Sequence, residues 1–510
     1  MMSKPQNSEP KLFYQGFTLE ERIPAKHPLR QIKRQVDFGF VRREVAHLYG
    51  VNGNISVDPE VILKLIFLLF YENVKSERTL MQQLPLRLDW LWFCGYDIDD
   101  ETPGHSVLSK ARGRWGVEVF SDFFTRILQR CMEAGLVDGQ TVHIDSSFVN
   151  GNAAKDSLKP QLRLIAENLY AELERQAALE ELPATPETAP EAVQTPDDPP
   201  PPQSTEPPEP GQVVSTTDPD ARLGKKYNQT TLGYKDHRVI DDKAGIITAT
   251  IVTPADTHDA KVFTEALETH QANTGCQVTT AVADKAYGNN ENYQYLQENN
   301  IKACIPHQKH ASKADPEFAQ DKFTYDSQKD CYHCPAGQQL TRYDQQPQHD
   351  RSYRYRAPRE VCQQCRFFAR CVSSQRYGRQ ITRNLDSEYT EWADSCLGNS
   401  ARRRLLARRR VRAEGSFADA ANNHGFKRAR WRSLIKVRIQ NLLIAAIQNL
   451  RKLLRHLGPS VVPAEAVIKT LVLARYLALA ALFCRTKSPF SRLWREYFLF
   501  QEPDYCFSLV

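Results

Sequence analysis

The sequence lacks an uncharged hydrophobic run long enough to cross a membrane. Residues 61–70 are apolar, but they reach only about half of a membrane span. Residues 467–484 are longer but contain Lys469 and Arg475, and charged side chains are costly in a lipid-facing helix. The first residues also lack the apolar stretch of a secretion signal. We therefore expect two core helices, no membrane partner, and a reducing cytoplasm in which the 12 cysteines are thiols or metal ligands.

The chain also has little net charge, because 67 Lys and Arg face 61 Asp and Glu, which leaves +6 over 510 residues. Its composition of 41% hydrophobic and 25% charged residues is that of a folded protein and excludes a collagenous or wholly disordered chain. The length allows roughly two to four domains. Only the distribution of the charges can therefore indicate a partner.

The patterns along the chain divide it into five parts. Apolar residues at helical spacing predict an α-helical domain over 1–135. Strand patterns separated by helices predict the first part of an α/β unit with a mixed sheet over 136–305, in which the Pro-rich, acidic stretch 183–222 is a disordered insertion. A Cys-rich region over 306–399 interrupts this unit, basic helices over 400–456 complete it, and 457–510 form a helical tail.

Three acids stand out as candidates for chemistry. Asp145 ends the apolar strand VHID, Asp284 ends the strand VTTAVAD, and Glu414 lies in a helix among many arginines. Singly, the aspartates could be turn formers and the glutamate an ion-pair partner. Brought together by the sheet, they would form an oxygen-rich site for Mg²⁺ or Mn²⁺. Two such ions about 4 Å apart can support an in-line phosphodiester displacement.

Basic residues are concentrated around Glu414. Such density predicts a surface that binds the phosphates of nucleic acid, although it would also suit a solvated charged face. The side chains that we assign to this surface are Arg408, Arg409, Arg410, Arg412, Lys427, Arg428, Arg430, Arg432 and Lys436.

Two Cys-x2-Cys pairs, 331/334 and 362/365, are separated by 27 residues, and Cys371 follows. A structural zinc ribbon takes four thiolates from two such pairs. Spacing alone favours Cys331 over Cys371 as the fourth ligand. The alternative is a set of reduced, buried thiols.

Several ordered blocks make the chain similar to a known family. They are DPEVILKLIFLLFYENVKSERTL and TPGHSVLSKAR near the N-terminus, HIDSSFVNGNAAKDS, GYKDHRVID, TPADTHDAKVF and ADKAYGNNENYQYL in the α/β unit, and AEGSFADAANNHGFKRARWRSLIKVRIQNLLIAAIQNL after the cysteines. Together they resemble bacterial insertion-sequence transposases of the DDE type, in the IS-eleven-eighty-two-like group of the IS-five superfamily.

The resemblance implies an RNase H-like catalytic core preceded by a helical domain that binds DNA or mediates dimerisation. It implies that Asp145, Asp284 and Glu414 are the catalytic triad. Asp145 would bridge two Mg²⁺ or Mn²⁺ ions, Asp284 would bind one of them and Glu414 the other. It favours Cys334, Cys362, Cys365 and Cys371 as the zinc ligands, with Cys331 as the alternative.

The implied function is metal-dependent cleavage of double-stranded DNA at the terminal inverted repeats and strand transfer to target DNA. Two ends must be held together, so a homodimer or larger assembly on DNA is expected, in the cytoplasm at the nucleoid. His258, Asp259, Lys285 and Tyr287 also match the family blocks as DNA contacts, although capping by Asp259 and packing by Tyr287 would explain two of them. Two alternatives stay open: a catalytically inactive DNA-binding regulator, and an RNase H-like nuclease without strand joining.

Overall fold

The computed structural model describes residues 18–50, 55–160, 163, 169–170, 213–226, 229–306, 316–346, 348, 352–372, 376–384 and 387–458. The chain divides into two compact units, residues 1–453 and 454–510, and all of the features below lie in the first unit apart from the end of the last helix. The predicted helical tail over 457–510, including the apolar stretch 467–484, lies outside the described residues apart from its first two positions. Within the described part, no helix combines the length and the apolar character needed to span a membrane.

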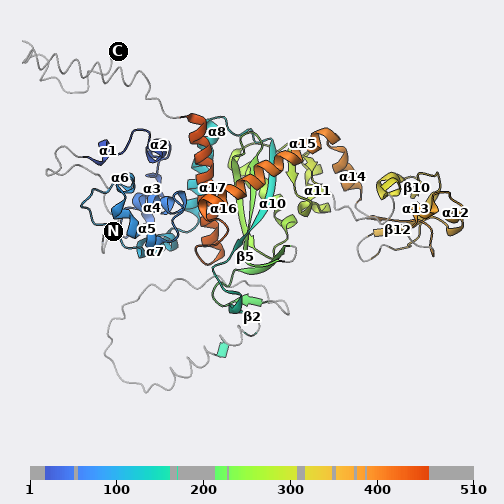
Figure 1. The fold of residues 1–510 in the computed structure, drawn as a ribbon, viewed down its shortest axis with the longest axis horizontal. Coiled ribbons are helices and arrows are strands. Elements are labelled where there is room, and N and C mark those ends of the chain that lie inside the picture. The colour runs from blue at the N-terminus through green and yellow to red at the C-terminus, as the bar shows by residue number, and fades with distance from the viewer. Residues whose placement is uncertain are drawn as a thin grey trace, which may run out of the picture. The chain divides into compact units, whose positions relative to one another are not determined.

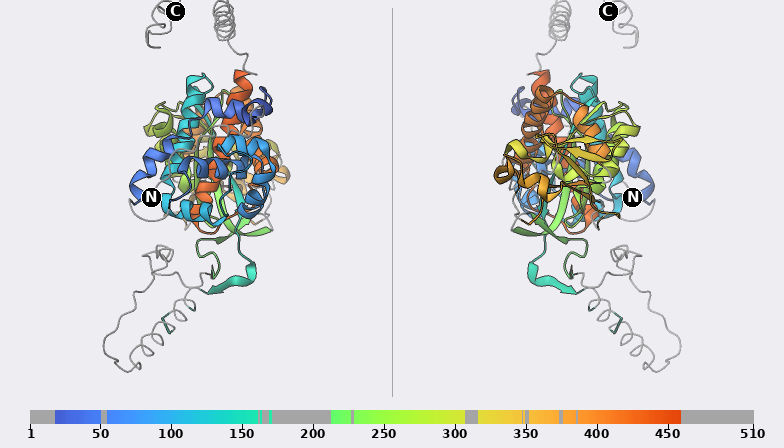
Figure 2. Two further views of the ribbon diagram at one scale, coloured as in Figure 1. Left: turned by 90° about the vertical axis from the view of Figure 1, so that its left-hand side faces the viewer. Right: turned by 90° about the vertical axis from the view of Figure 1, so that its right-hand side faces the viewer.

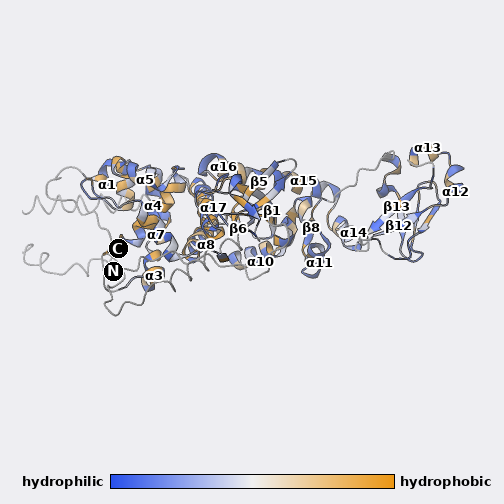
Figure 3. Cartoon of the chain, turned by 90° about the horizontal axis from the view of Figure 1, so that it is seen from below, coloured by the Kyte–Doolittle hydropathy of each residue, from blue (hydrophilic) through white to orange (hydrophobic). Residues whose placement is uncertain are grey.

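The N-terminal region is helical, as predicted. Its central helix is apolar along almost its whole length and is buried at every position from Val61 to Phe70, so the first apolar stretch is a core helix (Figure 3). Asp58 caps this helix by accepting a hydrogen bond from the Glu60 amide, and Pro59 occupies its first turn. This central helix is α4 (Pro59–Tyr71). The other helices of the region are α1 (Leu19–Arg22), α2 (Pro28–Gln35), α3 (Phe40–Val45), α5 (Glu77–Gln83), α6 (Leu88–Cys94), α7 (Ser106–Trp115) and α8 (Glu118–Glu133).

A mixed six-stranded sheet follows (Figure 1). Its hydrogen-bonded path runs β4-β5-β1-β7-β8, and β6 also pairs with the long strand β5. The pairs of β5 with β1, β4 and β6 are antiparallel, whereas β1, β7 and β8 are parallel. The strands are β1 (Thr141–Asn150), β4 (Arg222–Lys226), β5 (Gln229–Asp241), β6 (Ile247–Pro254), β7 (Thr280–Ala283) and β8 (Lys302–Cys304).

Helices pack against this sheet. The helix α10 (Phe263–Thr274) contacts β5 and β6, and α11 (Asn290–Glu298) contacts β8. Near the C-terminus, α15 (Asn399–Arg409) continues through a π-helical turn, η9 (Arg410–Glu414), into α16 (Gly415–His424), and α17 (Leu434–Leu457) follows. The turn η9 packs against β1 and β5.

Buried polar side chains tie the C-terminal helices to β5 and β6. The side chain of Asn449 on α17 both accepts from the Ile247 amide at 2.8 Å and donates to the Ile247 carbonyl at 2.7 Å. Arg238 on β5 donates to the Ser416 hydroxyl at 2.9 Å and to the Gln448 side chain at 2.8 Å. These bonds fix α16 and α17 on the sheet because buried polar groups are costly without partners.

The Cys-rich region forms a sheet of its own with strand order β13-β12-β11-β10-β9. Its small core contains Tyr332, Leu340, Tyr355 and Ile381, against which Cys334, Cys362 and Cys371 pack. The elements of this region are β9 (Thr324–Asp326), β10 (Cys331–His333), β11 (Gln339–Arg342), β12 (Ser352–Arg356), α12 (Arg359–Gln363), α13 (Phe368–Cys371), β13 (Gln380–Asn384) and α14 (Ser387–Ser395).

The predicted disordered insertion extends too far at its C-terminal end. Residues 213–222 are part of the fold: β3 (Val213–Ser215) pairs with β2 (Leu158–Pro160) as a separate two-stranded ribbon (Figure 2). The buried Asp218 accepts a hydrogen bond from the Tyr234 hydroxyl at 2.7 Å. Composition marked these residues as linker, but they are ordered by long-range contacts with β5. Residues 183–212 lie outside the described part of the chain.

Candidate active site

The two candidate aspartates lie side by side on neighbouring parallel strands. The last parallel pair between β1 and β7 is Ile144 with Ala283; Asp145 is the next residue of β1, and Asp284 directly follows the end of β7. The expectation that Asp145 ends its strand is wrong. β1 continues to Asn150 because residues beyond Asp145 stay paired with β5.

Each aspartate has one oxygen held by the backbone. Asp145 Oδ1 accepts from the Ser146 amide at 2.9 Å, and Asp284 Oδ1 accepts from the Lys285 amide at 2.7 Å as it caps a short 3-10 turn. Burial raises the pKa of Asp145; the positive charge of Arg409 acts in the opposite direction, and the negative charge of Asp284 adds to the increase. The two carboxylates are therefore close enough to repel each other.

Arg409, the last residue of α15, contacts the other oxygen of Asp145. Its Nη1 lies 3.0 Å from Asp145 Oδ2, and the two side chains are only 15% and 17% exposed. Arg409 was expected on the DNA-binding surface. The structure instead places its guanidinium on the carboxylate, where it neutralises the charge of Asp145.

Glu414 is carried toward the same face of the sheet. Directly opposed residues of antiparallel strands share a face, so Asp145 and Arg238 point to the same side. Arg409 contacts Asp145 from this side, and Ser416 contacts Arg238. Glu414 lies between these two contact points on η9, although within the described residues it makes no hydrogen bond or ion pair with either aspartate.

The π-helical turn gives Glu414 its local setting. In a π turn the backbone bonds span five residues, and such turns occur often at functional sites. Ala413 is buried, whereas Glu414 is exposed at the end of the turn. The sequence predicted one continuous helix here, because an extra residue in a helical turn leaves no mark on the hydrophobic pattern.

A polar network lies on the opposite face of the sheet from Asp145. Asp259 accepts from the Ser146 hydroxyl at 3.0 Å and forms an ion pair with Lys235 at 2.9 Å. His237 contacts the Tyr287 hydroxyl at 3.3 Å, and burial lowers the pKa of His237 to about 4. His258, rather than Asp259, caps the following turn.

Sequence reasoning missed Ser146, Lys235 and His237. The signal was the polar run KDHR within the strand GYKDHRVID. Side chains alternate between the two faces of a strand, so Lys235 and His237 lie on one face. Tyr287 is buried and packs against Phe263, as the packing alternative suggested.

The basic residues differ in exposure and in the groups that their side chains contact. Arg410 and Arg428 are exposed, Lys436 is half-buried, and the exposed Lys427 donates to the Ser147 hydroxyl at 2.8 Å, two residues from Asp145. The side chains of Arg408, Arg412 and Arg432 bind to the protein itself: Arg408 pairs with Asp242 at 2.8 Å, Arg412 donates to the Lys243 carbonyl at 2.9 Å and Arg432 to the Asn152 carbonyl at 3.1 Å.

Arg430 has a structural position. Its guanidinium donates to the Leu69 carbonyl at 3.1 Å and lies 4.5 Å from the centre of the Phe70 ring. Burial lowers the pKa of Arg430 to about 10. The next residue, Trp431, donates to Glu77 at 3.1 Å. This segment therefore packs on the N-terminal helices, which a count of local charges could not reveal.

Four of the five clustered cysteines share one pocket. Cys334, Cys362, Cys365 and Cys371 line it together. The Gln338 amide donates to Cys334 Sγ at 3.2 Å, and the Arg379 amide donates to Cys362 Sγ at 3.4 Å. Burial raises the pKa of Cys371, and the charges of the other three thiols add to the increase. Cys331 is not in this pocket; its Sγ lies 3.8 Å from His333 Nε2.

Two parts of the chain match known protein families. Residues 17–114 match the family described as "Transposase domain (DUF772)", and residues 333–454, which include Glu414 and the cysteine pocket, match the family described as "Transposase DDE domain". Two separate parts of the chain thus each match a transposase family.

Among curated proteins, the chain is similar to the "Transposase for insertion sequence element IS1106" of Neisseria meningitidis serogroup B. The two are 36% identical over 95 residues, which are 19% of this chain and 31% of the relative. The matched segment thus spans about a third of the relative's length.

Proposed function

We propose that this protein is the DNA transposase of an insertion sequence, which cleaves DNA at terminal inverted repeats and joins the ends to target DNA. The observation that carries the proposal is the placement of Asp145 and Asp284 just beyond the last parallel pair of β1 and β7, in a chain with transposase domains. Glu414, carried to the same face of the sheet by η9, would be the third acid of the triad.

The carboxylates suit divalent metal ions. The negative charge of Asp284 adds to the cost of ionising Asp145, and a cation between the two carboxylates would remove this repulsion. We infer that Asp145 would contact two Mg²⁺ or Mn²⁺ ions, Asp284 one of them and Glu414 the other. When bound, such ions activate the attacking water or 3′-hydroxyl and stabilise the leaving oxygen.

The chain's own residues position this chemistry. Arg409 must release Asp145 Oδ2 if that oxygen is to bind metal, and a phosphate of the DNA is a suitable new partner for its guanidinium. Lys427, Arg428 and Arg410 are exposed on elements that border β1 and would bind the DNA backbone. Arg430 does not belong to this surface, because its guanidinium is engaged with α4.

We further propose an RNase H-like core and a zinc ribbon. Three antiparallel strands, β6, β5 and β1, continued by the parallel strands β7 and β8, support the first. The second is supported by the pocket that Cys334, Cys362, Cys365 and Cys371 line, since four thiolates form a closed tetrahedral zinc site. Under this proposal the N-terminal helices bind the repeats or mediate the dimer that holds two ends together.

The test is cleavage and joining by the full chain with Mg²⁺ or Mn²⁺ on a labelled duplex that carries the inverted repeat flanking its own gene. We expect cleavage at the repeat end and a joined product, both lost in Asp145→Asn and Asp284→Asn. The matched control is Asp256→Asn, the same change at an exposed loop aspartate, which should keep both activities.

The other outcomes decide against the proposal. Cleavage without joined product would identify a nuclease, and binding without cleavage in either metal would identify an inactive regulator. Full activity of Asp145→Asn would refute the assigned triad. Absence of DNA binding would refute the assignment of Lys427, Arg428 and Arg410.

A further inference from the structure

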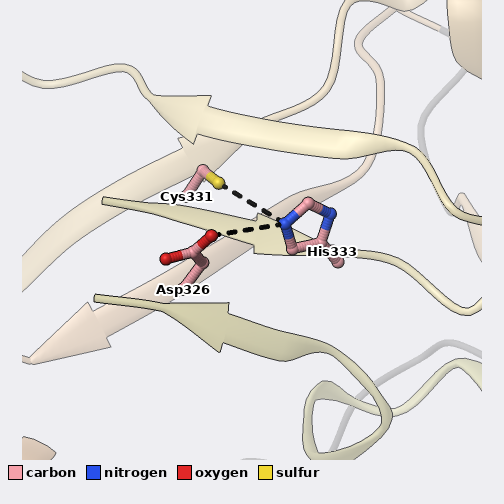
Figure 4. A group of neighbouring side chains, drawn as sticks. All are labelled: Asp326, Cys331 and His333. Carbon is pink, nitrogen blue, oxygen red and sulfur yellow. Dashed lines mark hydrogen bonds and ion pairs between the residues drawn. The ribbon is translucent and has the colours of Figure 1, made fainter. Parts of the chain in front are cut away.

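Outside the four-cysteine pocket, three potential metal ligands converge on the edge of the second sheet. Asp326 lies at the end of β9, and Cys331 and His333 lie on β10. One ligand atom from each lies within 4.8 Å of the other two. Figure 4 shows the Cys331 sulfur and the Asp326 carboxylate directed at the same imidazole nitrogen of His333, at 3.8 Å and 3.9 Å.

Strand geometry places this trio on the face opposite the cysteine pocket. Side chains alternate along a strand, so Cys331 and His333 share one face of β10, and Tyr332 takes the other. Tyr332 belongs to the small core against which Cys334 packs. Asp326 is the direct partner of Cys331 across the β9–β10 pair and thus shares its face.

We propose that Asp326, Cys331 and His333 form a second site for a divalent transition-metal ion, of which Zn²⁺ is the best fit. A tetrahedral zinc with Zn–N, Zn–S and Zn–O bonds of about 2.0 to 2.3 Å separates neighbouring ligand atoms by roughly 3.4 to 3.6 Å. The two distances to His333 exceed this by only a few tenths of an ångström, and the Cys331 and Asp326 ligand atoms lie within 4.8 Å of each other, so small movements of the exposed His333 and Asp326 side chains would close the site. A mixed set of thiolate, imidazole and carboxylate suits zinc, whereas Mg²⁺ and Ca²⁺ prefer oxygen alone.

The site is accessible and partly preorganised. Cys331 is 2% exposed, but His333 and Asp326 have side chains 39% and 28% exposed, which leaves the fourth position open to water. The turn amides of Gln328 and Lys329 bind Asp326 Oδ1, so Oδ2 is the oxygen that faces His333. Because β9 is an edge strand, a bound ion would clip it to β10 and stabilise the edge of the module.

The experiment measures zinc per chain by mass spectrometry on the full-length protein, purified under reducing conditions with Zn²⁺ and dialysed. If both zinc proposals hold, the wild type carries about two ions per chain. Cys331→Ser and His333→Ala should each lose one ion, and Cys362→Ser should lose the other. The Co²⁺-loaded Cys362→Ser variant should show weak sulfur-to-cobalt charge transfer from a single thiolate, whereas Co²⁺ in His333→Ala should show the strong absorption of four.

Two further variants test whether the loss of a zinc ion is caused by misfolding. Asp326→Asn keeps the turn acceptor and removes the charge, so it should keep the circular dichroism of the wild type and bind the second zinc at least tenfold more weakly. His105→Ala, the same substitution as His333→Ala at an exposed histidine of the N-terminal region, should keep both ions.

The results distinguish this site from the four-cysteine site. One ion per chain, lost in Cys362→Ser but kept in Cys331→Ser and His333→Ala, would overturn the second site alone. A single ion could also be lost in Cys331→Ser but kept in Cys371→Ser and His333→Ala. This result would show that Cys331 is a ligand of the first site, and it would overturn the second site. One ion lost in His333→Ala but kept in Cys362→Ser would support the second site and refute the first.

Discussion

The buried ion pair between Arg238 and Asp236 makes the strongest prediction about the fold. Both side chains are fully buried on β5, with Nε to Oδ2 at 2.7 Å. Arg238 also binds Ser416 and Gln448, so one guanidinium connects the sheet to α16 and α17. Replacing Arg238 with Met keeps most of the volume but leaves the Asp236 carboxylate buried without its cation.

The expected loss is large. Removing one partner of a buried ion pair costs about 3 to 5 kcal/mol because the remaining charge is uncompensated. An unfolding entropy of about 2.1 cal/mol/K per residue makes 1 kcal/mol equivalent to about 1 °C in a unit as large as residues 1–453, so Arg238→Met should lower the melting temperature by roughly 3 to 5 °C. Because burial already raises the pKa of Asp236, part of this loss should be recovered in Asp236→Asn/Arg238→Met, which removes both charges. Differential scanning calorimetry measures both shifts.

The control is the same substitution at an exposed pair. Arg130 and Glu133 are both 49% exposed and lie 2.7 Å apart, and such a pair contributes at most about 1 kcal/mol, so Arg130→Met should change the melting temperature by no more than about 1 °C. If Arg238→Met were no more destabilising than Arg130→Met, the pair would not hold the helices on the sheet, and our account of how Glu414 is positioned would fail.

Three further predictions concern the site and its surroundings. Arg409→Gln should tighten Mn²⁺ binding about tenfold or more, as measured by isothermal titration calorimetry. The reason is that the metal no longer has to break the charged hydrogen bond from Arg409 to Asp145, which contributes about 1.5 to 3 kcal/mol. Equal or weaker binding would contradict the proposal that Arg409 competes with the metal for Asp145. Burial lowers the pKa of His424 from 6.5 to about 4, so the folded protein holds this imidazole neutral. The free energy of unfolding is therefore full above pH 6.5 and falls by about 3 kcal/mol as the pH drops from 6.5 to about 4. Urea unfolding of His424→Gln should therefore show a shallower decline with acid than the wild type, and parallel curves would refute this. Lys427→Ala should weaken DNA binding and reduce the salt slope by about one, whereas Arg430→Ala should lower the melting temperature; the reverse pattern would show that Arg430 faces the DNA.

Local patterns predicted much of the architecture. The helical N-terminal region and the mixed sheet follow from hydrophobic periods of 3.6 and 2, which burial imposes on any helix or half-buried strand. The candidate acids Asp145 and Asp284 could be named because each follows a run of apolar residues in the sequence. The π turn that ends at Glu414 and the folded structure of residues 213–222 could not be predicted, since both depend on the elements that pack against them.

Charge and cysteine counts were the weaker guides. A run of arginines does not say which guanidinium meets a carboxylate, a carbonyl or solvent, and Arg409, Arg412 and Arg430 meet partners far away in sequence. Spacing likewise favoured Cys331 in the first metal site, whereas strand alternation turns it away from that pocket and toward His333.

The sequence by itself determined which segments form helices and strands, and which residue types are available for metal and DNA chemistry, because these depend on near neighbours. The tertiary structure decided which of these residues meet. The register of β1 on β7 brings Asp145 beside Asp284, the docking of α15 places Arg409 on Asp145, and the β9–β10 pair brings Asp326 to Cys331 and His333. Each of these contacts joins side chains whose approach depends on strand pairing and helix packing, which no local pattern specifies.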